Sequence, residues 1–278
     1  MAVTDFADLT DRFYRASLTN STHRENDTIP SGNEWLVWNP MLVDDLSRSG
    51  WPWNIAGPST AASWSYSTHP EYSIPHPVAA SGSIYTGAVH LPDLQTNTLG
   101  ALNGLMVDIV GVQGGLAMNS TASQTTNLPT ATLPTRVTGG DGVWMGLQIY
   151  ASGGSTDTTF TVTYTNQAAT GGRTSTFAAV STPVNGDFYM MPLQAGDTGV
   201  RSVESVQLSA STGTAGNFGV ILFKPLFITM PAVGIQDFTH IPGWNTPIDD
   251  EAVLTWLPYY YGGVSSQTQT TTFSFFEA

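Results

Sequence analysis

The sequence predicts an all-β protein, built around a β-sandwich or jelly-roll-like domain with a short N-terminal helix and extended irregular arms. From about residue 100 to 230, apolar and polar residues alternate with the two-residue period of strands. The alternating segments are separated by loops rich in Gly, Thr and Ser, with no helical period between them. Hydrophobic residues make up 41% of the chain, which is enough to form a core.

The change of periodicity divides the chain into three parts. Residues 1–99 are expected to hold the N-terminal helix and a Trp/Pro-rich extended arm. Residues 100–230 form the predicted sandwich domain, and residues 231–278 a C-terminal extension.

The best helical pattern lies at residues 4–17, "TDFADLTDRFYRAS". Thr4 is a suitable N-cap, with acidic residues in the first turn and arginines near the end, where each charge favours the helix dipole. Phe6, Leu9 and Phe13 recur at helical spacing and form an apolar stripe. So short a helix needs a surface on which this stripe can dock.

The following segment is rich in Pro, Ser, His and Trp and has little sustained periodicity. It carries Trp35, Trp38, Trp51 and Trp53. Its prolines resist both helix and central strand. We interpret it as an extended arm whose aromatic side chains are covered either by the chain's own sheet or by a neighbouring copy.

Seven segments are predicted to be strands: "GLMVDIVGVQ", "GVWMGLQIYAS", "TTFTVTYTN", "RTSTFAAVS", "GDFYMMPLQ", "VESVQLSAS" and "FGVILFKPLFIT". In the third, Phe160, Val162 and Tyr164 share one face and threonines the other, and residues 158–180 read as a hairpin. Residues 218–223, "FGVILF", are apolar on both faces and indicate a central strand.

The C-terminal extension contains two further candidate elements. One short helix is expected in "PGWNTPIDDEAVLTWLPYYYGG", beginning near Thr246 or Asp249 and ending at Leu257. The tail at residues 268–278 alternates again and is expected to add an edge strand.

The charge balance excludes several classes of partner. The net charge of −13 comes from 21 acidic and 8 basic residues, which disfavours nucleic acid and anionic membranes. The absence of cysteine excludes disulfides and thiolate chemistry. No secretory signal or membrane-spanning run is recognised. Only 10% of residues are charged, against about 25% in ordinary domains, so the surface suits contact with neighbours.

No active site is predicted. The chain lacks the G-x-S-x-G pentapeptide of a serine hydrolase. A glycosidase would need two facing carboxylates, for which Asp108, Asp141 and Asp249 are the candidates. Asp108 lies inside an apolar strand, and a solvent-facing side chain or a pair with one of the few arginines is favoured over catalysis.

No metal or cofactor is expected either. His69, Glu71 and His76 are interpreted as exposed arm residues, because the prolines around them impose no fixed spacing. The tryptophans offer a different alternative, since exposed Trp and Tyr side chains stack on sugar rings. Five of the eight tryptophans fall in the irregular arm, so we favour anchors at a protein contact.

Two stretches of the chain carry a resemblance. Residues 158–176, "TTFTVTYTNQAATGGRTST", and residues 193–226, "LQAGDTGVRSVESVQLSASTGTAGNFGVILFKPL", resemble the β domains of virion structural proteins from tailed bacteriophages. The resemblance implies a particle component, such as a head decoration or minor capsid protein, or a tail or fibre part. It implies no functional residues, because such proteins act through surfaces.

The resulting hypothesis is a structural virion protein that decorates or cements a bacteriophage capsid. Its expected partners are other copies of itself and virion proteins such as the major capsid protein, within a virion assembled in the host cytoplasm. The alternative is a tail, fibre or receptor-binding component that recognises a surface glycan. The predicted contact residues are the apolar side chains of the helix and arm: Phe6, Leu9, Phe13, Trp35, Trp38, Trp51 and Trp53.

Overall fold

The structure is a computed structural model. It describes residues 21–24, 62–63, 65–68, 84–92, 102–128, 133–180, 182–183, 187–229, 247–260 and 269–277. Side chains are described for residues 65–68, 105–128, 133–177, 182–183, 187–226 and 248–255. The helix expected at residues 4–17 lies outside these ranges.

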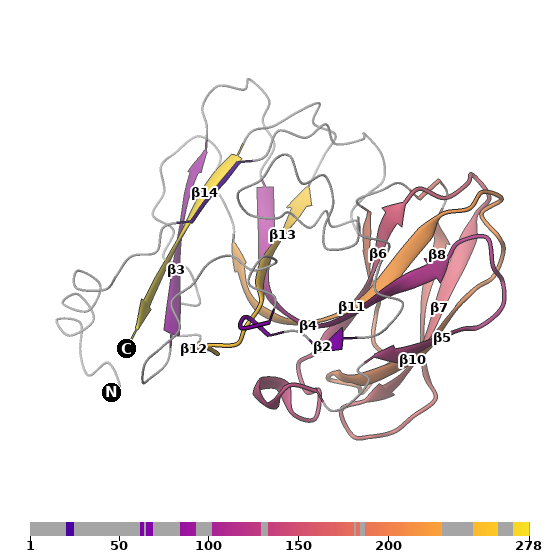
Figure 1. The fold of residues 1–278 in the computed structure, drawn as a ribbon, viewed down its shortest axis with the longest axis horizontal. Coiled ribbons are helices and arrows are strands. Elements are labelled where there is room, and N and C mark those ends of the chain that lie inside the picture. The colour runs from indigo at the N-terminus through magenta and orange to yellow at the C-terminus, as the bar shows by residue number, and fades with distance from the viewer. Residues whose placement is uncertain are drawn as a thin grey trace.

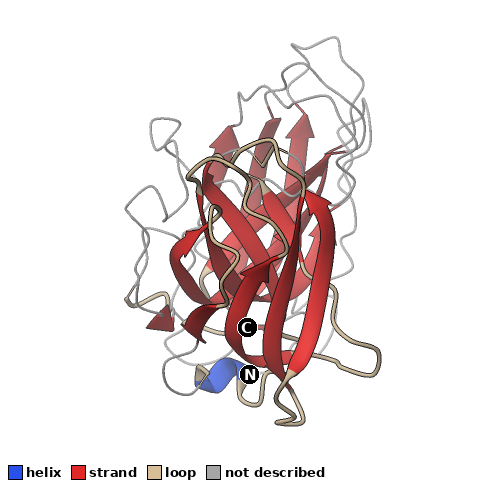
Figure 2. Ribbon diagram, turned by 90° about the vertical axis from the view of Figure 1, so that its right-hand side faces the viewer, coloured by secondary structure: helices blue, strands red, loops and turns tan. Residues whose placement is uncertain are grey.

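The described chain is all-β, as predicted, and its only helical element is the short 3-10 helix η2, Thr135–Val137. The strands are β1 (Ser21–Arg24), β2 (Ala62–Ser63), β3 (Ile84–Pro92), β4 (Leu102–Ala117), β5 (Gln124–Leu128), β6 (Trp144–Ala151), β7 (Thr158–Asn166), β8 (Arg173–Val180), β9 (Phe188–Met190), β10 (Val200–Leu208), β11 (Asn217–Thr229), β12 (Pro247–Ile248), β13 (Leu254–Tyr260) and β14 (Gln269–Glu277). Figure 2 shows the short helix at one end of the strands.

The strands form three antiparallel sheets. A six-stranded sheet has the order β13-β4-β11-β6-β9, with β2 paired to β4, and a four-stranded sheet has the order β5-β10-β7-β8. The remaining sheet has the order β1-β14-β3-β12. Figure 1 shows β3 and β14 set apart from β5, β7, β8 and β10, with β4 and β11 between them.

The strands from β4 to β11 form a two-layer sandwich in which the chain alternates between layers. If these strands are counted from one to eight, one layer has the order 1-8-3-6 and the other 2-7-4-5. Only β7 and β8 are neighbours both along the chain and in a sheet, so the predicted hairpin is confirmed. Every other connection between consecutive strands crosses from one layer to the other.

A hydrophobic core fills the space between the two layers. Phe160, Val162 and Tyr164 point into it and are fully buried, as the alternation of this strand predicted. Phe160 packs edge-on against Phe218 of the opposite layer, with ring centroids 5.2 Å apart. Full burial of one such side chain contributes about 1.5–3 kcal/mol to the free energy of unfolding. The core between the two layers is therefore the main source of stability.

Strand β11 is central, as predicted, because it lies between β4 and β6. Phe218, Val220 and Leu222 belong to the core between the layers. Ile221 and Phe223 lie on the other face of the sheet, in a second cluster that we call the outer cluster. Its buried members are Leu105, Val107, Ile109, Val112, Phe188, Ile221, Phe223 and Val253. These side chains are at most 6% exposed, so this face is covered within the single chain.

The helix expected between Thr246 and Leu257 is wrong. Residues Leu254–Tyr260 form strand β13, which pairs with β4 along its whole length. Leu254 and Thr255 are buried there. The β-branched and aromatic residues of "VLTWLPYY" fit a pleated sheet, and the hydrogen bonds to β4 outweigh a weak local preference for helix.

The C-terminal tail forms a strand as expected, but it does not lie at an edge. Strand β14 lies between β1 and β3, so segments from both ends of the chain build one sheet. Strand β5 was not among the predicted strands. Strands β2 and β13 lie outside residues 100–230 in the sequence, yet both pair with β4 of the six-stranded sheet. This sheet therefore extends beyond the predicted sandwich segment. The division of the chain into three parts stays a prediction.

Candidate functional site: two buried aspartates and an apolar cluster

Asp108, in the middle of β4, forms a buried ion pair with Arg136 of η2. The arginine Nε donates to Oδ2 at 2.7 Å and Nη2 donates to Oδ1 at 3.1 Å. Nη2 also donates to the carbonyl oxygen of Ile109. The side chains of both partners are only 4% exposed. Of the two favoured interpretations of Asp108, the pair with an arginine is therefore the one that the structure shows.

The same carboxylate also fixes the segment that leads into β13. The Val253 amide donates to Asp108 Oδ1 at 2.8 Å, and the Ile109 amide donates to the Val253 carbonyl oxygen at 2.8 Å. Burial raises the pKa of Asp108, since the hydrogen bond and charge of Arg136 only partly offset the loss of hydration. Asp108 is thus a point where β4, η2 and the C-terminal part of the chain are held together.

Part of the N-terminal region is fastened beside this point. The Ser67 amide donates to Glu251 Oε2 and the Tyr66 amide to the Glu251 carbonyl oxygen, both at 3.0 Å. Hydrogen bonds from Ser67 lower the pKa of Glu251. Together with the β2–β4 pairing, these bonds place residues 62–63 and 65–68 on the chain's own sheet.

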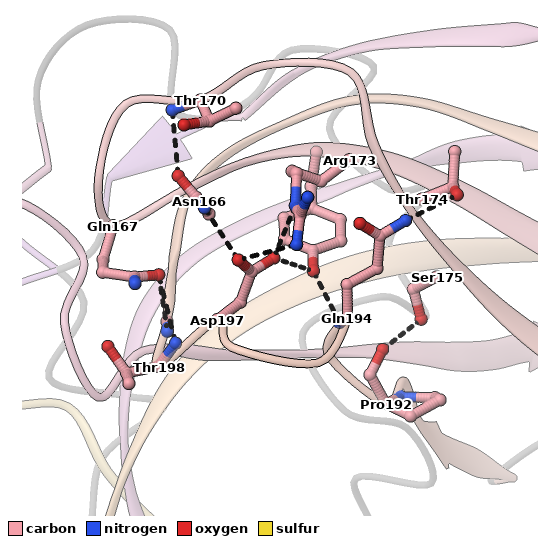
Figure 3. A network of polar contacts seen from close by, with 12 residues as sticks. Asn166, Gln167, Thr170, Arg173, Thr174, Ser175, Pro192, Gln194, Asp197 and Thr198 are labelled. Atoms are coloured by element: carbon pink, nitrogen blue, oxygen red, sulfur yellow. Dashed lines mark hydrogen bonds and ion pairs between the residues drawn. The ribbon is translucent and has the colours of Figure 1, made fainter.

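Asp197, in the loop before β10, is the centre of a second network (Figure 3). Oδ1 accepts from Asn166 Nδ2 at 2.7 Å and from Arg173 Nη2 at 3.1 Å. Oδ2 accepts from the Tyr164 hydroxyl at 2.6 Å and from Arg173 Nε at 3.0 Å. The Tyr164 oxygen in turn accepts from the Gln194 amide at 2.8 Å.

This network joins the ends of β7 and β8 to the 191–199 loop. The hydrogen bonds of Arg173 and Tyr164 lower the pKa of Asp197 to about 2. Nearby, Gln167 Oε1 accepts from the amides of Thr198 and Gly199, as Figure 3 shows for the turn beside Asp197. The network keeps the Asp197 carboxylate ionised and fixes the conformation of the 191–199 loop. Each oxygen of this carboxylate accepts two hydrogen bonds.

The buried residues of the outer cluster, on the outer face of the six-stranded sheet, are all apolar. Phe188 packs edge-on against Phe223, with ring centroids 5.8 Å apart. Gly146 lies beneath the Phe188 ring, and a Cβ added there would lie 2.2 Å from Phe188 Cζ, so a side chain at this position would displace the ring. Trp144, at the start of β6, is 39% exposed.

The seven predicted contact residues lie outside the described residues, so their role stays a prediction: Phe6, Leu9, Phe13, Trp35, Trp38, Trp51 and Trp53. The same holds for His69, Glu71 and His76. In the ranges that the structure describes, no group of three or more His, Cys, Asp or Glu residues could hold a metal ion. Within those ranges, no helix is long and apolar enough to cross a membrane.

The three candidate glycosidase acids have separate partners. Asp108 pairs with Arg136, and the Asp141 Oδ1 atom accepts from the Thr198 hydroxyl. Asp249 Oδ1 accepts from the Glu251 amide at 3.0 Å, in a turn. The sequence reasoning missed Asp197 and its partners. The available signal was the scarcity of arginine, since a buried acid in so arginine-poor a chain requires one of them.

No family model matches this chain, and no curated protein matches it in sequence. Among solved structures, the chain is similar to VP2 of infectious bursal disease virus in a subviral particle, at 10% identity over 100% of this chain and 82% of that one, with a TM-score of 0.23. The structure of the Gx strain of the virus is 9% identical over 94% of this chain and 80% of that one, with a TM-score of 0.22. The structure of T=1 particles derived from the virus is 10% identical over 100% of this chain and 80% of that one, with a TM-score of 0.21. At such low TM-scores no structural inference follows from the likeness.

Proposed function

We propose that this protein is a non-enzymatic structural component of a virus particle, whose sandwich is a jelly roll that packs against other copies of the chain. The strand order carries the proposal. Two four-stranded layers with orders 1-8-3-6 and 2-7-4-5 have the connectivity of an eight-stranded jelly roll. Viral capsid domains are among the proteins that use this fold, together with lectins and cupins.

The interior of the sandwich supports a packing role over ligand binding between the layers. Fully buried aromatic side chains from both layers fill it, including Tyr164, Phe160 and Phe218. A jelly roll that binds a small molecule between its sheets needs space there. The low content of charged residues, 10% of the chain, also suits a surface that is covered in an assembly.

Capsid decoration in a tailed bacteriophage is the specific role that the sequence resemblance supports. The acidic net charge of −13 is compatible with a position away from the packaged nucleic acid. In this role the protein acts through contact surfaces, with the major capsid protein as a further partner, and it is assembled into the virion in the host cytoplasm.

The test is the mass of the purified chain in solution. Sedimentation velocity and negative-stain electron microscopy are carried out over a range of protein and salt concentrations. We expect closed oligomers whose population grows with ionic strength, because salt screens the repulsion between acidic copies. A monomer under every condition would contradict self-assembly.

One observation favours a second candidate function, a glycan-binding virion component. Lectin domains share the jelly roll, and the exposed Trp144 offers an indole face for a sugar ring. Titration with a set of oligosaccharides while tryptophan fluorescence is recorded separates the two functions. Saturable quenching that disappears in Trp144→Phe would support glycan binding.

A further inference from the structure

Segments from the two ends of the chain share one edge of β4. Strand β13 pairs with β4 up to Asp108, and β2 pairs with β4 farther along the same strand. Because β11 pairs with these residues of β4 from the other side, β2 and β13 follow one another along a single edge. We call residues 249–260, which end in β13, the strap, and residues 62–63 and 65–68 the N-terminal segment.

The sandwich itself holds the strap in place. Asp108 accepts a hydrogen bond from the Val253 amide, and the Val253 carbonyl oxygen accepts one from the Ile109 amide. Arg136 of η2 fixes the Asp108 carboxylate with two hydrogen bonds. Residues 252–254 are at most 2% exposed, so the strap is packed against the sandwich as well as hydrogen-bonded to it.

The N-terminal segment is held in large part by the strap. The Ser67 amide donates to Glu251 Oε2 and the Tyr66 amide donates to the Glu251 carbonyl oxygen, both at 3.0 Å. The ladder of the segment with β4 is formed by β2, which has two residues, against seven in β13. A strand this short is below the usual length and forms a weak ladder.

The position of Glu251 depends on the strap. Its amide donates to Asp249 Oδ1 at 3.0 Å, and the Ala252 amide donates to the Asp249 carbonyl oxygen at 2.9 Å, so the residues form a closed turn. Two residues after Glu251 comes Val253, which Asp108 holds. A continuous chain of hydrogen bonds therefore leads from the sandwich through the strap to the N-terminal segment.

The sheet β1-β14-β3-β12 shows the same dependence. It alternates strands from the two ends of the chain, and β1 and β3 pair there with the C-terminal strands β14 and β12. Figure 1 shows β3 and β14 side by side. Among the described strands of residues 1–99, β2 alone pairs with a strand of the sandwich. The described N-terminal strands are thus joined to the sandwich largely through C-terminal ones.

We propose that the strap must be docked on β4 before the N-terminal segment can dock, so that the two segments are released in a fixed order. Lifting the strap removes the acceptors of the Tyr66 and Ser67 amides and leaves only a weak two-residue ladder. Lifting the N-terminal segment leaves the β13 ladder and the hydrogen bond between Val253 and Asp108 intact.

This order has a consequence for the predicted contact residues, which all precede residue 62 in the sequence. On the basis of the proposed function, the strap controls how the part of the chain that carries them is attached to the sandwich. The docking order itself is a property of the single chain and does not depend on self-assembly.

The first experiment lifts the strap in the full-length protein with Leu254→Asp. Leu254 is fully buried and is the Cα partner of Asp108, so the new carboxylate would lie opposite an existing one in a dry site. Hydrogen exchange is followed by mass spectrometry in peptides covering residues 65–68, residues 254–257 and β7. We expect exchange to rise about tenfold or more in the first two and to stay slow in β7. Leu254→Met, which conserves the volume, is the matched control and should leave all three unchanged.

The second experiment lifts the N-terminal segment alone. Tyr66→Pro combined with Glu251→Ala removes both hydrogen bonds between the segment and Glu251. Proline is favoured at the second position of a β-turn, so the turn at residues 65–68 is kept. We expect fast exchange at residues 65–68, while residues 254–257 stay better protected than in Leu254→Asp.

Three results would overturn the proposed order. Residues 65–68 could keep their wild-type protection in Leu254→Asp although residues 254–257 have lost theirs. Residues 254–257 could lose protection in the Tyr66→Pro/Glu251→Ala variant as completely as in Leu254→Asp. Residues 65–68 could also be better protected than residues 254–257 in the wild type, a comparison that needs no variant and stands even if Leu254→Asp does not fold. Dilute protein is used throughout, so these results are independent of self-assembly, which sedimentation velocity tests separately.

Discussion

Asp108 and Asp197 each accept two hydrogen bonds from an arginine, Arg136 and Arg173 respectively, yet their pKa values move in opposite directions. Asp108 and Arg136 are both only 4% exposed, and burial raises the pKa of the aspartate. Arg173 is 28% exposed, and its hydrogen bonds, with that of Tyr164, lower the pKa of Asp197 to about 2. The Asp197 side chain is itself only 3% exposed, so exposure of the carboxylate does not separate the two pairs. The difference follows from the more exposed arginine at Asp197 and from its additional donors Tyr164 and Asn166.

The two ion pairs therefore contribute to the stability of the protein in different ways. At Asp108 the loss of hydration offsets much of the attraction, so the pair contributes mainly by holding β4, η2 and the Val253 segment in one arrangement. At Asp197 the charged form is favoured in the folded state, so this network adds stability that depends on pH.

The largest effect is expected when the Asp108 pair is broken from one side. Asp108→Ala removes the carboxylate that pairs with the buried Arg136 charge and removes the acceptor of the Val253 amide. We expect a loss of about 3–5 kcal/mol in the free energy of unfolding, measured by urea denaturation.

The matched control replaces both charges with apolar residues. Asp108→Leu combined with Arg136→Met removes the uncompensated charge, so it should recover most of the stability lost in the single variant. A single variant as stable as the wild type would show that Arg136 finds water or another acceptor, and the pair would then not hold the three segments together.

A smaller loss is expected for Tyr164→Phe. Its hydroxyl donates to Asp197 and accepts from the Gln194 amide, so the variant removes the acceptor of that amide and leaves Asp197 Oδ2 with the Arg173 Nε hydrogen bond. We expect a cost of roughly 1–3 kcal/mol in thermal or urea unfolding. Tyr189→Phe is the control, because among the described contacts that hydroxyl makes one hydrogen bond, to Asp187, so its loss should cost less. The reverse order would contradict the central role of Asp197.

The pH dependence of stability sharpens the comparison further. The folded pKa of Asp197, about 2, lies below its ordinary value of 3.8, so its contribution is complete above pH 3.8 and is lost as the pH falls towards 2. Asp197→Asn should flatten the urea stability profile in that window. Asp108 has a raised pKa, so its contribution is complete below pH 3.8 and is lost as the pH rises through its folded pKa. Profiles of the same sign for Asp197→Asn and Asp108→Asn would contradict this account.

The smallest effect is expected for Arg173→Lys. Lysine keeps the charge but cannot make the two parallel hydrogen bonds of the guanidinium. The pKa of Asp197 should rise from about 2 part of the way towards 3.8, and the stability at every pH above 3.8 should fall by the corresponding small amount, because the hydrogen bonds from Tyr164 and Asn166 remain. Carbon NMR of the Asp197 carboxyl group during an acid titration measures the shift, and an unchanged pKa would assign it to Tyr164 and Asn166.

The sequence predicted those strands whose pattern is local. The alternation of Phe160, Val162 and Tyr164 with threonines requires one buried and one open face, and the structure has both. The run at residues 218–223 is apolar on both faces and likewise required a central position, because both faces of that strand had to be covered.

The rest depends on contacts between distant parts of the chain. Residues 254–260 become a strand only because β4 offers a free edge, which no local pattern reveals. The partner of Asp108 lies 28 residues away on η2, and the interaction of Asp197 with Tyr164 spans 33 residues, so neither could be found by spacing. The predicted contact residues of the helix and arm stay predictions.

The way the chain alternates between layers also has a consequence for the order of folding. Only β7 and β8 pair with a neighbour along the chain within the sandwich, and every other ladder there joins strands separated by at least one further strand. Closing such long loops costs chain entropy before any contact is gained, which makes folding slow. We therefore expect the β7–β8 hairpin to form early and the β4–β11 and β5–β10 ladders late, so that a growing chain would complete its sandwich only after β11 has been synthesised.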